Sequence, residues 1–157
     1  RSAYGGMIPW VGVHAIDWVL HLGGACRGVF AVQNADFNRG HGELEMTAAA
    51  VFDLQDGVVA TITADYLRPD GAPRHDDDRL LITGTEGTLE AVDGKAYIED
   101  HNARRPLPLP ERTMPFLRFV DAIGTIDAER QAEEALEASR ISLLARQSGD
   151  EHRYIET

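Results

Sequence analysis

Apolar residues recur at every second position through the middle of the chain. Between Glu43 and Phe52, the even-numbered residues are apolar, whereas Glu43, Glu45 and Thr47 are polar. This period of two predicts a half-buried β-strand over 43–52, with its polar residues on the opposite face. Asp56 and Gly57 then predict a tight turn into a second alternating strand over 58–66.

Shorter segments elsewhere have the same strand character. They are 28–35, 79–83, 87–92 and 95–100, and a second Asp-Gly pair at 93–94 joins the last two. Strands joined by two-residue turns are antiparallel, because the chain reverses direction between them. The pattern therefore predicts a mostly antiparallel sheet of about six strands.

Helical periodicity predicts three helices around this sheet. The first begins after Gly12 and ends at Gly23-Gly24. A second is predicted from a cap at Thr113 to Gly124, with an apolar stripe of Phe116, Phe119, Val120 and Ile123. A third is predicted from Ala128 to Ser148, with Gly149 as its stop and a core face of Ala132, Leu136, Ser139 and Leu143.

Strands followed by helices favour an α+β fold, with helices on one face of an open-faced sheet. At 157 residues with 43% hydrophobic content, we expect one compact domain over 1–157. The opposite sheet face is expected to carry Val59, Thr61, Thr63, Glu43, Glu45, Thr47, Ala49 and Val51. This face is too apolar to be wholly solvated, so we expect it to pair in a homodimer or homotetramer.

Charge and cysteine content limit the partners of the chain. A formal net charge of −11 argues against nucleic acid, which requires clustered basic residues. No run of residues approaches the length of a membrane span, so no membrane partner is expected. The single cysteine, Cys26, permits no internal disulfide and fits a reducing, cytoplasmic compartment.

The first predicted helix carries a polar stripe. His14, Asp17, Trp18 and His21 fall at positions i, i+3, i+4 and i+7, so they share one face. Histidine carries protons at neutral pH, which makes His14 a candidate acid–base group. The alternative is a structural histidine satisfied by a local hydrogen bond. Asp17 could orient the imidazole, but the favoured interpretation is structural, because an aspartate near a helix N-terminus stabilises the helix through the dipole and capping.

An ordered set of motifs resembles the C-terminal domain of the glucose–fructose oxidoreductase/inositol dehydrogenase (Gfo/Idh/MocA) family. The matching pieces are Gly5-Gly6, His14, Asp17, Leu22-Gly23 and the stretches 52–62 and 82–92. The family's nucleotide-binding half has no counterpart here. We therefore expect the 157 residues to be the C-terminal part of a longer protein.

The resemblance implies roles for particular residues. His14 would be the catalytic histidine beside the nicotinamide and substrate, and Gly6, Trp10 and Asp17 would be substrate-binding residues. In the family, an aspartate often precedes this histidine by four residues, but Trp10 stands there in this chain. Tryptophan cannot relay a proton, so the usual acid–base pair is broken.

Other candidate sites are weaker. His14, Asp17 and His21 could ligate zinc from one helix face, but the sequence shows no conspicuous fourth ligand, and no metal site is expected. The loop segment 74–78 reads as a solvated charge run rather than a cation site, although Arg68 and Arg74 could contact a ligand. The segment from Gly84 to Gly87 lacks the lysine and the following helix of a phosphate-binding loop, so we interpret it as a turn between strands.

Two functions remain open. The first is the substrate-binding and oligomerisation domain of an oxidoreductase that acts on a sugar, polyol or related hydroxyl compound. NAD or NADP would bind in the full-length protein, whereas no cofactor is expected in this chain. The resemblance places the family's catalytic lysine in the other half, since Lys95, the only lysine here, lies in a hairpin. The second function is a non-catalytic binding or scaffold module descended from such enzymes.

Overall fold

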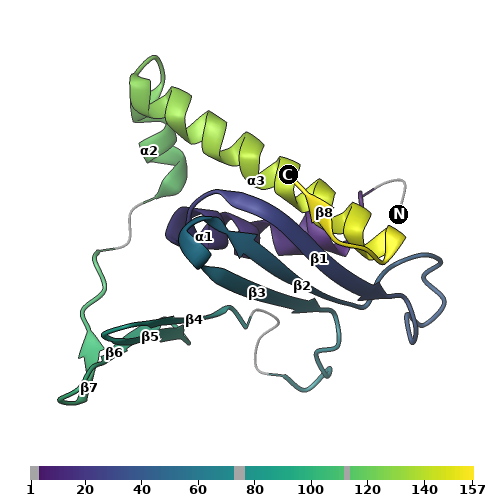
Figure 1. Ribbon diagram of the computed structural model, residues 1–157, viewed down its shortest axis with the longest axis horizontal. Coiled ribbons are helices and arrows are strands. Elements are labelled where there is room, and N and C mark those ends of the chain that lie inside the picture. Colours follow the sequence, from purple (N-terminus) through teal and green to yellow (C-terminus); the bar gives the residue numbers. More distant parts are fainter. Residues whose placement is uncertain (1–3, 73–76, 112–113) are drawn as a thin grey trace. The chain divides into compact units, whose positions relative to one another are not determined.

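The structure is a computed structural model that describes residues 4–72, 77–111 and 114–157 (Figure 1). The chain forms two compact units. The first comprises Arg1–Leu67 and Ala122–Thr157, and the second comprises Arg68–Asp121. The two units are described separately below.

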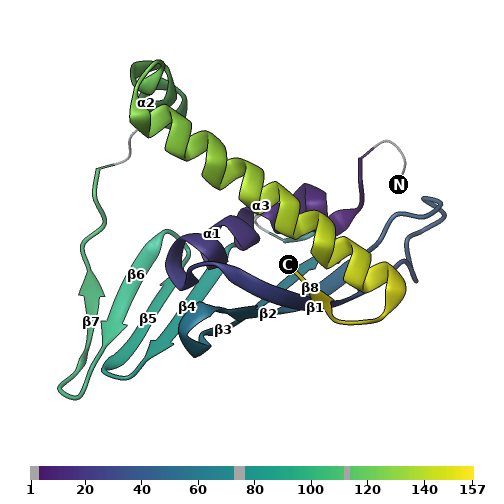
Figure 2. The same ribbon diagram turned by 45° about the horizontal axis from the view of Figure 1, so that its top comes forward.

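A four-stranded antiparallel sheet forms the centre of the first unit, with strand order β3-β2-β1-β8. Its strands are β1 (Cys26–Asn34), β2 (Thr47–Leu54), β3 (Val59–Asp65) and β8 (Ile155–Glu156). Its helices are the π-helical turn η1 (Ile8–Gly12), α1 (Val13–Gly23) and the long α3 (Ile126–Glu151). The helices cover one face of the sheet, and α1 also packs against α3 (Figure 2).

The core lies between this sheet face and the helices. The predicted alternation in β2 is confirmed, because Ala48, Ala50, Phe52 and Leu54 are all buried. Their neighbours in the core have aliphatic side chains and include Val29, Ala31, Ile16, Ile141 and Ala145. The predicted turn is also confirmed within the short helix η2 (Gln55–Gly57), where Asp56 and Gly57 have φ of 58° and 75°.

The second unit contains another four-stranded antiparallel sheet, with order β4-β5-β6-β7. Its strands are β4 (Arg79–Gly84), β5 (Gly87–Val92), β6 (Lys95–Glu99) and β7 (Arg104–Leu107). The predicted Asp-Gly turn joins β5 to β6, with φ of 55° at Asp93 and 69° at Gly94. The helix α2 (Pro115–Ala122) follows the sheet.

The α+β class is confirmed, but the single sheet of about six strands is wrong: the described residues form two sheets of four strands. The sequence pattern missed β7, which consists of exposed residues with no alternation, and β8, which has only two residues. Neither strand buries a continuous apolar face, so neither leaves a period of two in the sequence.

The predicted faces of the later helices are wrong. Phe116, Phe119, Val120 and Ile123 are exposed, since the apolar stripe finds no cover within the described part of the chain. On α3, Leu136 is 71% exposed. The predicted cap at Thr113 lies outside the described residues.

Small residues instead form the buried face of α3, namely Ala138, Ser142, Ala145, Ser148 and Gly149, together with Ile141. A Cβ atom at position 149 would lie 3.1 Å from Cδ of Gln33, so Gly149 permits close packing rather than ending the helix. Over the described residues, no helix is both long and apolar enough to cross a membrane.

Candidate functional site

The candidate site is built on a continuous helical segment formed by η1 and α1. Gly5 and Gly6 precede it with φ of 82° and 105°, a backbone region that favours glycine. The carbonyl of Gly6, which is itself buried, accepts a hydrogen bond of 3.1 Å from the Trp10 amide. The glycine pair therefore turns the chain sharply into the helix. A π-helical turn such as η1 is rare and is often found at functional sites.

One face of this segment is exposed. Trp10 is 61% exposed, and His14, Asp17, Trp18 and His21 are also exposed. Ile8 and Ile16 on the other side are fully buried in the core. The predicted stripe is thus confirmed as one exposed surface. It contains Trp18, with Trp10 beside it, and such large aromatic side chains are more often buried than exposed.

The structure supports neither a local hydrogen bond for His14 nor a helix-stabilising role for Asp17. The His14 and Asp17 side chains make no hydrogen bond or ion pair with each other or with any other described residue. The dipole interpretation of Asp17 is wrong, because the first turn of α1 contains no acidic residue and η1 extends the helix further toward the N-terminus. Both side chains are therefore available to a ligand or to another part of the protein.

Sequence reasoning missed a buried carboxylate beside this segment. Glu45 was expected on the open sheet face, but it is only 3% exposed and lies before β2 rather than within it. Its Oε2 atom accepts hydrogen bonds from the Tyr4 hydroxyl and from the Met7 amide, the latter at 3.3 Å. Burial, reinforced by the hydrogen bond to Glu45, raises the pKa of Tyr4 to about 12. An alternating pattern cannot reveal such a cluster, since the tyrosine lies 41 residues away.

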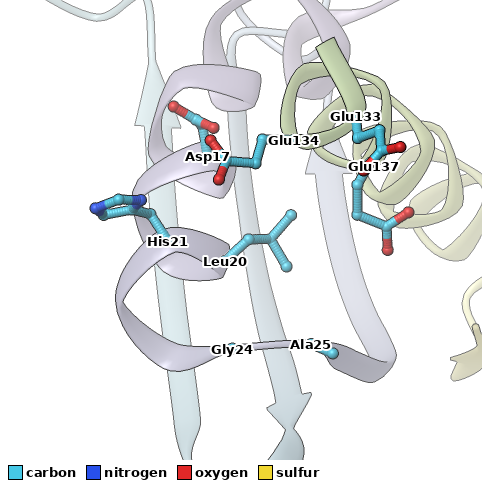
Figure 3. Close-up of a pocket in the computed structure, with 8 residues that line it drawn as sticks. All are labelled: Asp17, Leu20, His21, Gly24, Ala25, Glu133, Glu134 and Glu137. Carbon is cyan, nitrogen blue, oxygen red and sulfur yellow. The ribbon is translucent and has the colours of Figure 1, made fainter. Parts of the chain in front are cut away.

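A pocket of about 400 Å³ lies between α1 and α3 (Figure 3). Leu20 points from α1 toward α3, whereas His21 points away. The acidic lining consists of Asp17, Glu133, Glu134 and Glu137. Glu137 is paired with Arg140 at 2.7 Å, and this interaction lowers the pKa of the glutamate. Carboxylates repel phosphate groups, so the pocket is unsuited to the pyrophosphate of a dinucleotide.

The weaker candidates receive no support as ligand sites. Within the described ranges, no group of three potential metal ligands converges. Residues 74–76 of the charged loop, including Arg74, lie outside the described residues. Asp77 pairs with Arg68 at 2.6 Å and with Arg79 at 3.2 Å, so Arg68 has an acidic partner within its own unit. Gly84 and Gly87 join two strands and precede no helix, as expected.

The sheet face opposite the helices is open and carries aligned rows of side chains. Phe30, Val51 and Thr61 are paired across β1, β2 and β3, and the next row is Val32, Ala49 and Thr63. Phe30, Val32 and Val51 are exposed, and Val59 is 70% exposed. Apart from Glu43 and Glu45, which lie outside β2, the composition predicted for this face is found in the structure.

Residues 1–90 match the family model of the GFO/IDH/MocA C-terminal domain. This match covers more than half of the chain, so the chain belongs to that family. The resemblance inferred from Gly5-Gly6, His14 and the later motifs is therefore confirmed. No curated protein matches the chain.

Solved structures agree with this assignment. A suspected oxidoreductase from Thermotoga maritima is 40% identical, with a TM-score of 0.92, over 100% of this chain and 49% of that protein. Another from Erwinia carotovora atroseptica is 26% identical, with a TM-score of 0.79, over 92% of this chain and 48% of that protein.

An oxidoreductase from Agrobacterium radiobacter, solved with NAD+, L-tartaric acid and magnesium, shares the fold. It is 18% identical, with a TM-score of 0.65, over 93% of this chain and 47% of that protein. The chain thus spans about half the length of the solved structures it matches.

Proposed function

We propose that this chain is the substrate-binding and oligomerisation half of an NAD(P)-dependent oxidoreductase that acts on a sugar, a polyol or a related hydroxyl compound. Family membership supports the oxidoreductase class. The proposal places the whole protein in the cytoplasm, where Cys26 would remain reduced.

The exposed stripe on η1 and α1 carries this proposal. Trp10, His14 and Asp17 lie together on one exposed helix face, and Trp10 leaves most of its ring in water. Large exposed aromatic side chains beside an unpaired histidine are typical of a surface that binds a ligand or another domain. In the proposal, substrate and the nucleotide-binding half cover this face in the full-length protein.

His14 would act on the hydroxyl group of the substrate. Oxidation of a carbinol releases a proton from oxygen and a hydride from carbon; the imidazole would accept the proton, and the hydride would pass to the oxidised nicotinamide held by the other half of the protein. Asp17 would hydrogen-bond neighbouring hydroxyls, and Trp10 would pack against the apolar face of a sugar or polyol. Gly6 is buried, so in the proposal it contributes to substrate binding by turning the chain into the helix that presents Trp10 and His14.

The proposal places no dinucleotide on the described residues. Dinucleotide phosphates commonly bind to backbone amides at the start of a helix that follows a glycine-rich turn. Gly84 and Gly87 lie between strands, and the helix start after Gly5-Gly6 is already occupied by the Glu45 carboxylate. The pocket of Figure 3 has an acidic lining. NAD or NADP would therefore be held by the other half of the protein.

A non-catalytic binding module is the second candidate. The specific observation in its favour is Trp10, which stands four residues before His14 where the family often has an aspartate. The structure adds that no described carboxylate hydrogen-bonds to His14. A module of this kind would bind a hydroxylated compound without turning it over.

The test is a turnover screen with the full-length protein. Reduction of NAD+ and NADP+ is followed at 340 nm with polyols, sugars and hydroxy acids as substrates. The proposal expects turnover with at least one of these compounds. Saturable ligand binding without any turnover would instead favour the non-catalytic module.

We further propose that the open sheet face pairs two copies of the chain. A specific interface of this kind buries on the order of 1,600 Å². Sedimentation equilibrium should show a dimer that dissociates when Val59→Glu and Thr61→Arg are combined. Leu136→Glu changes an exposed leucine on α3 instead, and should leave the dimer intact. A monomeric wild-type chain would contradict this proposal.

A further inference from the structure

The helical segment that carries Trp10 and His14 begins without a local cap. No side chain near Met7 caps the start of η1, although the first amides of a helix need hydrogen-bond acceptors. Helix N-termini usually obtain this acceptor from a serine, threonine, aspartate or asparagine immediately before the helix. Here the preceding residues are the glycine pair, which has no side chains to offer.

Glu45 supplies the missing acceptor from a distant part of the chain. The Met7 amide, 38 residues earlier, donates to Glu45 Oε2 at 3.3 Å. A carboxylate at this position also interacts favourably with the positive end of the helix dipole. The cap is tertiary, so it fixes the helix start to the sheet rather than merely completing the first turn.

Tyr4 and the adjoining backbone hold Glu45 in place. The Tyr4 hydroxyl donates to Oε2, and the Glu45 amide donates back to the Tyr4 oxygen at 3.4 Å. The next residue, Met46, is tied to the sheet by its amide to Asn34 and by its carbonyl to the Tyr66 amide, at 2.8 and 2.9 Å. The Glu45 backbone therefore has little freedom to move away from the helix.

We propose that Glu45 is a positioning residue, whose buried carboxylate fixes the start of the η1–α1 helix and thereby the place of Trp10 and His14 against the substrate. The catalytic part of this inference rests on the proposed function. Glu45 touches neither substrate nor cofactor in this proposal, since it is buried against Tyr4 and Met7 at the start of the helix that presents His14.

Hydrogen exchange measures the anchoring directly in the 157-residue chain. Glu45→Gln removes the charge, and charge-assisted hydrogen bonds are about twice as strong as neutral ones. Exchange of the Met7 and Trp10 amides should accelerate roughly tenfold. Amides in β1 and β2 should keep their rates. The matched control is Glu43→Gln, which makes the same change at an exposed position two residues away.

Kinetics of the full-length protein measure the positioning. Glu45→Gln should lower kcat roughly tenfold with little change in the KM for cofactor, because misplaced catalytic groups reduce the chemical step. Glu43→Gln should leave both constants unchanged. Should Glu45→Gln fail to fold, Tyr4→Phe removes only the supporting hydroxyl and should shift both measurements in the same direction.

Unchanged exchange at Met7 and Trp10 would overturn the inference. Faster exchange with an unchanged kcat would also overturn it, because Glu45 would then be only structural. Absence of wild-type turnover would defeat the proposed function instead, and the exchange rates alone would then decide whether Glu45 anchors the helix.

Discussion

Ile16 attaches the candidate site to the core, and its truncation yields a prediction with a defined magnitude. Its side chain is fully buried on the side of α1 opposite His14. Ile16→Ala removes three carbon atoms, which costs about 2.4 kcal/mol at about 0.8 kcal/mol for each buried group. The cavity adds about 1 kcal/mol, and the better helix propensity of alanine offsets about 0.4 kcal/mol. The expected loss is therefore about 3 kcal/mol.

Urea unfolding followed by tryptophan fluorescence measures this loss. Both tryptophans, Trp10 and Trp18, lie on the η1–α1 segment, so their emission reports the unit that contains Ile16. The midpoint should fall without a change in the slope, as expected for a change in stability alone.

Ile126→Ala is the matched control for this measurement. This isoleucine is 77% exposed at the start of α3, so its truncation should change stability by less than about 0.5 kcal/mol. Equal effects of the two substitutions, or a loss below about 1 kcal/mol for Ile16→Ala, would refute the packing described for α1.

Three further predictions concern stability and reactivity. Burial is the main cause that raises the pKa of Tyr4 from 10.0 to about 12. Between these pH values the folded state keeps a proton that the unfolded state releases, so the free energy of unfolding should fall as pH rises from 10.0 to about 12. Urea unfolding of Tyr4→Phe at a series of alkaline pH values should lack this loss of stability. Burial raises the pKa of the Cys26 thiol, so iodoacetamide should alkylate it on the order of 100-fold more slowly in the native chain than in urea. Gly23→Ala would place a Cβ atom 2.4 Å from Leu54 Cδ1 and should cost about 1–3 kcal/mol in urea unfolding, whereas Gly71→Ala, with open space around it, should be nearly neutral.

The sequence was informative where periodicity and turn chemistry act locally. The alternation ending at Phe52, the two Asp-Gly turns and the stripe from His14 to His21 each depend on residues within one element. A period of two or of 3.6 residues places such side chains on a common face, whatever the rest of the fold does. These features could be predicted, and they include the candidate site face.

Long-range features left no such pattern. The buried face of α3 is made of small residues such as Ala138 and Ser148, because close packing excludes large ones. Periodicity of large apolar residues therefore selected Leu136, which lies on the exposed side. Glu45 is buried because it pairs with Tyr4 and Met7, and a contact of this kind depends on the completed fold.

The central claim is that His14 carries the proton in an oxidoreductase reaction. It is tested most directly by kcat of the full-length protein with His14→Ala and His14→Gln, using a substrate identified in the turnover screen. His21→Ala is the control, because His21 lies two turns further along the same exposed helix face, about 10 Å away. We predict a loss of roughly 100-fold or more for both His14 variants and a near-normal rate for His21→Ala. A loss below about threefold in both His14 variants would contradict the claim, since a positioned acid–base group contributes roughly 100-fold or more.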